Sequence, residues 1–171
     1  MITERKDARV CHENGLVVPD EGNIHAALID REGAWISRVL VSGFAANLDG
    51  LASTYNTTTH MLILGRRPQS IARAARRVRE LNGGIVVVEG EKATFELALP
   101  VSGMMSSLPF DDVVELNRRL SHAVARAGYE HHDILYTLLF LTCDFLPALR
   151  LTPLGLIDVK SSETLAAAER L

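Results

Sequence analysis

A short polar run, Asn56-Thr57-Thr58-Thr59-His60, carries the side chains best suited to chemistry, and it lies between two apolar segments. Amide and hydroxyl groups both donate and accept hydrogen bonds, and an imidazole can exchange a proton near neutral pH. Polar groups that follow a buried strand commonly face a cleft. The run therefore predicts a binding site for a neutral heterocycle at Asn56, Thr57, Thr59 and His60. The alternative is a loop whose Asn and Thr side chains bond their own backbone.

Two other groups of residues could bind a ligand. Glu130-His131-His132-Asp133 contains four metal-capable side chains, but adjacent residues rarely point at one ion, so an exposed turn is favoured and no metal site is predicted. A cluster of arginines in one expected helix could bind phosphate or nucleic acid. Its members are Arg66, Arg67, Arg73, Arg76, Arg77 and Arg79. Because the formal net charge is −3, a solvated helix face is favoured and no nucleic-acid partner is expected.

Cysteine and serine chemistry has little support in the sequence. Cys11 and Cys143 lie far apart and form neither a disulfide framework nor a zinc motif, which favours a reducing cytoplasm. Ser102 lacks the Gly-x-Ser-x-Gly frame of a nucleophile elbow. The first residues are charged, unlike a signal peptide, and no apolar stretch reaches the ~20 residues of a membrane span. We expect a cytoplasmic protein that does not contact a membrane.

Strands and helices must position these residues. Apolar runs and period-two alternation predict strands over 15–18, 24–29, 35–41, 51–55, 61–64, 85–88 and 93–99. Pro68 begins a helix that Asn82-Gly83-Gly84 terminates. Asp111 begins a second helix, and a further helix or buried segment follows from about Asp133.

Length and composition set the expected organisation. A chain of 171 residues, 47% apolar and 23% charged, fits one domain with a substantial core. We expect an α+β fold in which helices cover a mixed or mostly antiparallel sheet. Residues 1–14 are predicted to form an N-terminal arm, 15–160 the domain, and 161–171 a C-terminal helix or tail, with Ser162 as the cap of that helix.

Several segments, taken in order, resemble the C-terminal domain of bacterial adenine deaminases. They are Gly15-Leu16-Val17-Val18-Pro19 with Gly22, Val41-Ser42-Gly43-Phe44, Leu51-Ala52-Ser53-Thr54, Asn82-Gly83-Gly84-Ile85-Val86-Val87, residues 99–109 and residues 149–159. The segment from Leu99 to Pro109 is the most similar single piece. The resemblance covers roughly residues 15–160, and the order and spacing of the pieces carry it.

The resemblance implies an association with adenine deamination, the conversion of adenine and water to hypoxanthine and ammonia. In that family a metal-activated water attacks the ring, and the divalent metals, such as manganese or iron, lie in a separate amidohydrolase barrel that precedes this domain. A barrel alone needs about 250 residues, and the chain shows no His-x-His pair or other catalytic metal motif. We therefore expect no cofactor in this chain and no activity without a barrel partner.

The polar run departs from the family pattern. The family carries His-Asp-Ser-His-Asn just before its central strand, where this chain has Asn56-Thr57-Thr58-Thr59-His60. The carboxylate that could bind a cation or accept a proton is absent here. Neutral hydrogen-bonding groups and one imidazole remain, which suit a purine better than a phosphate or a metal ion.

Three functions are consistent with these observations. The first is an adenine-deaminase accessory domain that works with an amidohydrolase barrel. The second is a free-standing, non-catalytic module that binds a small molecule such as a purine or another protein. The third is an independent hydrolase that uses His60, against which the missing metal ligands count. Because the related domain packs on a larger partner, we also expect exposed apolar surface and a homo-oligomer.

Overall fold

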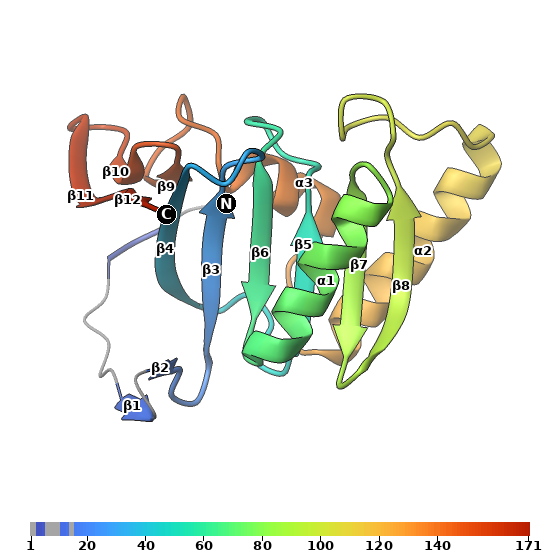
Figure 1. The fold of residues 1–171 in the computed structure, drawn as a ribbon, viewed down its shortest axis with the longest axis horizontal. Coiled ribbons are helices and arrows are strands. Elements are labelled where there is room, and N and C mark those ends of the chain that lie inside the picture. Colours follow the sequence, from blue (N-terminus) through green and yellow to red (C-terminus); the bar gives the residue numbers. More distant parts are fainter. Residues whose placement is uncertain (1–2, 6–10, 14–15) are drawn as a thin grey trace.

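A seven-stranded antiparallel sheet forms the centre of the chain in the computed structural model, which describes residues 3–5, 11–13 and 16–171 (Figure 1). The strand order is β12-β4-β3-β6-β5-β7-β8. In sequence order these strands are β3 (Asn23–Ile29), β4 (Trp35–Ser42), β5 (Gly50–Ser53), β6 (Met61–Gly65), β7 (Gly84–Glu89), β8 (Lys92–Ala98) and β12 (Glu169–Arg170). All neighbouring pairs run antiparallel.

Two smaller sheets flank the central one. β1 (Cys11–Glu13) pairs with β2 (Leu16–Val18) as a hairpin. β9 (Leu149–Thr152), β10 (Gly155–Asp158) and β11 (Glu163–Ala167) form a three-stranded sheet beside β4.

Helices cover the sheet unequally on its two faces. α1 (Pro68–Glu80) packs over β5, β6 and β7, and its own residues Ile71, Ala74 and Val78 are buried. α2 (Phe110–Arg126) and α3 (Ile134–Phe140) lie behind the sheet in Figure 1. The larger apolar core joins these two helices to the sheet, and a smaller core lies under α1. The sheet thus has helices on both faces, α1 in front and α2 and α3 behind.

The fold confirms the predicted α+β class and the antiparallel sheet. The helix expected over 162–171 is wrong, because β11 and β12 occupy that segment. β11 pairs with β10, and β12 extends the central sheet by pairing Glu169 with Ile36 of β4. Pairing with the neighbouring β10 and with the distant β4 outweighs the weak local helix signal there. Of the arm predicted over 1–14, residues 1–2, 6–10 and 14 lie outside the described residues, and 11–13 form β1.

In the described part of the chain, every helix is too short or too polar to cross a lipid bilayer.

Candidate functional site

The polar run forms the loop between β5 and β6, and buried Asn56 organises it (Figure 1). The Nδ2 of Asn56 donates to the carbonyl of His60 at 2.8 Å and lies 3.5 Å from that of Ser53. Its Oδ1 accepts from the Thr58 backbone N–H at 3.0 Å and from the Thr58 hydroxyl at 2.7 Å. The hydroxyl of Thr142 lies 3.5 Å from the same oxygen. The loop therefore folds around the amide of Asn56, which its own neighbours saturate.

Thr57 and Thr59 hold the loop in a fixed conformation. The exposed Thr57 bonds α3 through its backbone N–H, which donates to the Leu139 carbonyl at 3.2 Å. The hydroxyls of Thr57 and Thr142 lie 3.0 Å apart. Thr59 has φ of 57°, a left-handed conformation that a threonine rarely adopts. These contacts connect the loop to a segment more than 80 residues away.

His60 lies at the end of the loop beside Asp30, Arg31 and Trp35. Its Nδ1 is 3.3 Å from the Asp30 carboxylate and 3.3 Å from the Arg31 backbone N–H, which donates to it when the ring is neutral. The Trp35 ring lies edge-on to it, with centroids 4.8 Å apart. The His60 side chain keeps 25% of its surface exposed. Among the four predicted binding residues, this ring combines exposure with a neighbouring carboxylate.

The structure brings Asn56, Thr57, Thr59 and His60 together in one loop, and ligand binding there stays a prediction. Sequence reasoning missed Thr142 and Asp30, which contact the loop from distant segments. A single sequence carries no signal for either contact.

A separate cleft of about 850 Å³ opens between β3, β4, α3 and β9. Phe44, Val41 and Leu151 contribute apolar lining, while His132 and Tyr136 contribute polar groups. Thr3, Glu4 and Arg5 also line it, and the polar loop does not. Its volume and apolar character are those of a small-molecule site.

The Glu130–Asp133 segment has structural roles in this fold. The Nε2 of His131 lies 2.7 Å from the carbonyl oxygen of Gly43. Asp133 caps α3 by accepting from the Tyr136 backbone N–H at 3.1 Å. Within the described ranges no group of three or more metal-capable side chains converges.

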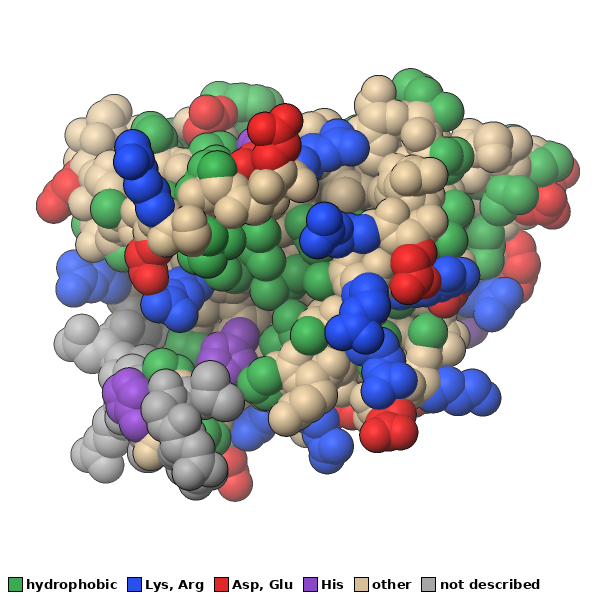
Figure 2. Space-filling view, viewed as in Figure 1, with side chains coloured by type: hydrophobic (Ala, Val, Ile, Leu, Met, Phe, Trp, Pro, Cys, Tyr) green, Lys and Arg blue, Asp and Glu red, His purple; other side chains and the backbone are tan. Residues whose placement is uncertain are grey.

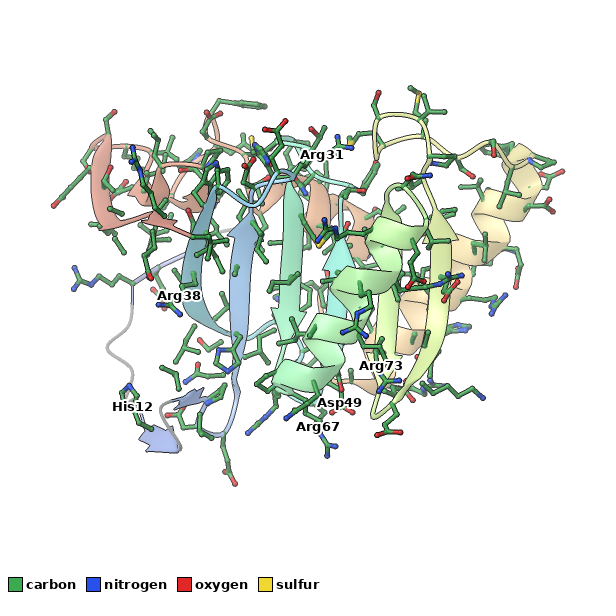
Figure 3. The ribbon with its side chains drawn as sticks, in the orientation of Figure 1. His12, Arg31, Arg38, Asp49, Arg67 and Arg73 are labelled. Atoms are coloured by element: carbon green, nitrogen blue, oxygen red, sulfur yellow. The ribbon has the colours of Figure 1, made fainter. Side chains whose placement is uncertain are left out.

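The arginines on and before α1 divide into paired and unpaired members; Figure 3 shows Arg67 beside Asp49, and Arg73 on α1. Arg67 pairs with Asp49 at 3.1 Å, and Arg77 pairs with Glu96 and Glu80. These hydrogen bonds raise the pKa of Arg77 and lower that of Glu96. Arg73, Arg76 and Arg79 are exposed, and no carboxylate in the described part of the chain pairs with them. α1 therefore presents an uncompensated positive surface.

His25 on β3 is a half-buried histidine whose Nε2 has no hydrogen-bond partner among the described residues. Burial lowers the pKa of its ring below the ordinary value, and a hydrogen bond with the backbone of Val17 partly offsets this effect. The folded chain thus favours the neutral ring.

We expect acidification from about pH 7.5 to about pH 5.5 to destabilise the fold partly through His25. Its folded-state pKa lies below the unfolded value, so the unfolded chain binds the proton first. The stabilisation is fully present above the unfolded pKa and is lost as pH falls toward the folded value. Urea denaturation should show a smaller stability difference between the two pH values for His25→Gln. An undiminished difference would contradict this, and exposed His122→Gln is the matched control.

The fold defines the class of protein first: the chain forms an α+β domain built on an antiparallel sheet, not a catalytic barrel. The chain belongs to the adenine deaminase C-terminal domain family, whose sequence model matches residues 1–163. A Bacillus cereus protein named "Putative adenine deaminase" is 40% identical over 139 residues, which are 81% of this chain and 24% of that protein. The Brucella abortus protein named adenine deaminase is 34% identical over 143 residues, 82% of this chain and 25% of that protein.

The chain thus spans about a quarter of the length of the curated relatives it matches. The similarity extends over the polar loop and the cleft-lining strands, which lie inside the matched residues.

Proposed function

We propose that this chain is an accessory domain of adenine deamination that acts with a metal-bearing amidohydrolase barrel and is inactive alone. The family match over residues 1–163, against about a quarter of each relative's length, carries the proposal. The rest of those relatives is long enough to hold a barrel of about 250 residues.

The side chains of this domain support the proposal that the barrel, and not this chain, carries out the catalysis. Adenine deamination needs an activated water, and the described residues hold no convergent set of metal ligands. Beside the polar loop, Asp30 lies against His60, and the described residues form no cluster of metal-capable groups there. The manganese or iron expected for the reaction would therefore bind in the barrel.

The purified chain should release no ammonia from adenine, with or without added manganese, iron or zinc. The reason is that the described residues hold no convergent group of three or more metal-capable side chains, which a metal-activated water would need. A coupled ammonia assay checks this, with the complete Brucella abortus adenine deaminase as the positive control. Metal-dependent turnover that persists through rigorous purification would contradict the proposal.

The cleft of about 850 Å³ favours a second candidate, a non-catalytic module that binds a small molecule. The sequence instead predicts purine binding at the loop of Asn56, Thr57, Thr59 and His60. Calorimetric titration with adenine and hypoxanthine separates the two sites, since His60→Ala should weaken binding at the loop and Tyr136→Ala binding in the cleft. Absence of binding at millimolar base would remove the purine from this proposal.

A further inference from the structure

The front face of the central sheet is only half covered. α1 lies over β5, β6 and β7, while no described helix covers the same face of β3 and β4. We call this uncovered half the open face. Its residues pair across β4 and β3 as Ile36–Ile29, Arg38–Ala27 and Leu40–His25, while in the same rows Met61 and Ile63 of β6 pack against the core under α1. An amphipathic sheet stabilises a fold by burying such a face against another element.

The open face is apolar and shallow along its middle. Ile36 and Leu40 of β4 and Ile29 of β3 are half-buried, and Ala27 between them is buried, although no helix in the described part of the chain covers β3 and β4. Ala27, at the centre, is small enough to let a backbone approach closely. Figure 2 shows hydrophobic side chains along the sheet beside α1, with Lys and Arg side chains bordering them. The open face is therefore an apolar surface against which a further secondary-structure element can pack.

The width of the open face matches that of one helix. Neighbouring strands lie about 4.8 Å apart, so β3 lies two strands, or about 10 Å, from β5 beneath α1. Packed helices have axes about 8–10 Å apart. A helix centred over β3 would thus cover β3 and β4 and pack against the flank of α1, where Ala72 and Ala75 offer small side chains.

Charge indicates what kind of helix fits. Exposed Arg73, Arg76 and Arg79 line α1 with no carboxylate partner in the described ranges. A partner helix with Asp or Glu along the edge that faces α1 would neutralise them. A second copy packed face to face fits less well, because it would bury the exposed, unpaired Arg73 and Arg76 of each copy against an apolar surface.

We propose that the open face binds an amphipathic helix, acidic along one edge, that belongs to the catalytic part of an adenine deaminase. This inference rests on the proposed accessory function, and it assigns the contact to the front of β3 and β4, beside α1. Arg38 is a suitable reporter, since its side chain lies on this face and is 64% exposed (Figure 3).

The test replaces the matching quarter of Brucella abortus adenine deaminase with this chain carrying Arg38→Cys. Alkylation of that cysteine, followed by peptide mass spectrometry, should be at least about tenfold slower in the chimera than in the isolated chain, because a bound helix must first open. Arg119→Cys, on the exposed surface of α2, is the matched control and should react equally in both. Circular dichroism verifies that each variant is folded.

A charge variant sharpens the test. Replacing Arg76 and Arg79 with Glu should restore much of the alkylation of Arg38→Cys in the chimera, whereas Arg118→Glu with Arg119→Glu should not. Equal alkylation of Arg38→Cys in chimera and isolated chain would overturn the inference, as would protection in the isolated chain that grows with its concentration. The ammonia assay on the same chimera tests the accessory function separately, so a protected but inactive chimera would reject only that proposal.

Discussion

Asn56→Ala should lower the free energy of unfolding by about 3 kcal/mol, because it leaves several partly buried groups without partners. The substitution removes the acceptor of the Thr58 N–H and hydroxyl and the donor to the His60 carbonyl. Asn56 is fully buried, so water cannot readily replace these bonds. Urea denaturation followed by circular dichroism measures the change.

Exposed Asn47→Ala is the matched control for this prediction, and it should change stability by no more than about 0.5 kcal/mol. A similarly small effect of Asn56→Ala would show that the loop does not depend on the amide. Since the loss of stability needs no ligand, the measurement also separates a structural role for Asn56 from the predicted purine site.

The polar run shows how far the sequence could predict the site. Asn and Thr between two apolar strands predict either a cleft or a loop that bonds itself. The structure shows the bonds within the loop, which local residues at short spacing could form. The Thr142 contact depends on how α3 and the following turn pack behind the sheet. Tertiary packing of that kind is absent from local sequence patterns.

The same distinction explains which elements were predictable. The apolar run Ile85-Val86-Val87-Val88 predicted β7, and the helical spacing after Pro68 predicted α1. Both predictions are correct, because the apolar residues of each pattern are the ones that the fold buries. β12 was missed because Glu169 and Arg170 are exposed, and only pairing with β4 makes them a strand. An ion pair at 2.7 Å between Arg38 of β4 and Glu169 of β12, which are 131 positions apart, accompanies this strand pairing.

Arg150 is another feature that the sequence does not reveal. It lies on β9 at 2% exposure, although arginine is rarely buried without a partner. Its Nη1 donates to the Thr3 hydroxyl at 3.0 Å and to the Leu149 carbonyl at 2.6 Å, and its Nη2 donates to the Pro147 carbonyl. Among the described residues, its Nε has no hydrogen-bond partner and no carboxylate forms an ion pair with its guanidinium. Burial accordingly lowers its pKa from the ordinary value.

Arg150→Ala should therefore destabilise the fold by about 3–5 kcal/mol, because it leaves a large cavity and unpaired carbonyl oxygens. Arg150→Met should recover most of this loss, since it refills the volume and removes a desolvated charge that lacks a counter-ion. Urea denaturation of both variants checks this, with exposed Arg119→Ala expected within about 0.5 kcal/mol of the unmodified chain. If Arg150→Met is as unstable as Arg150→Ala, the guanidinium hydrogen bonds to Thr3, Leu149 and Pro147, rather than the filled volume, stabilise this region.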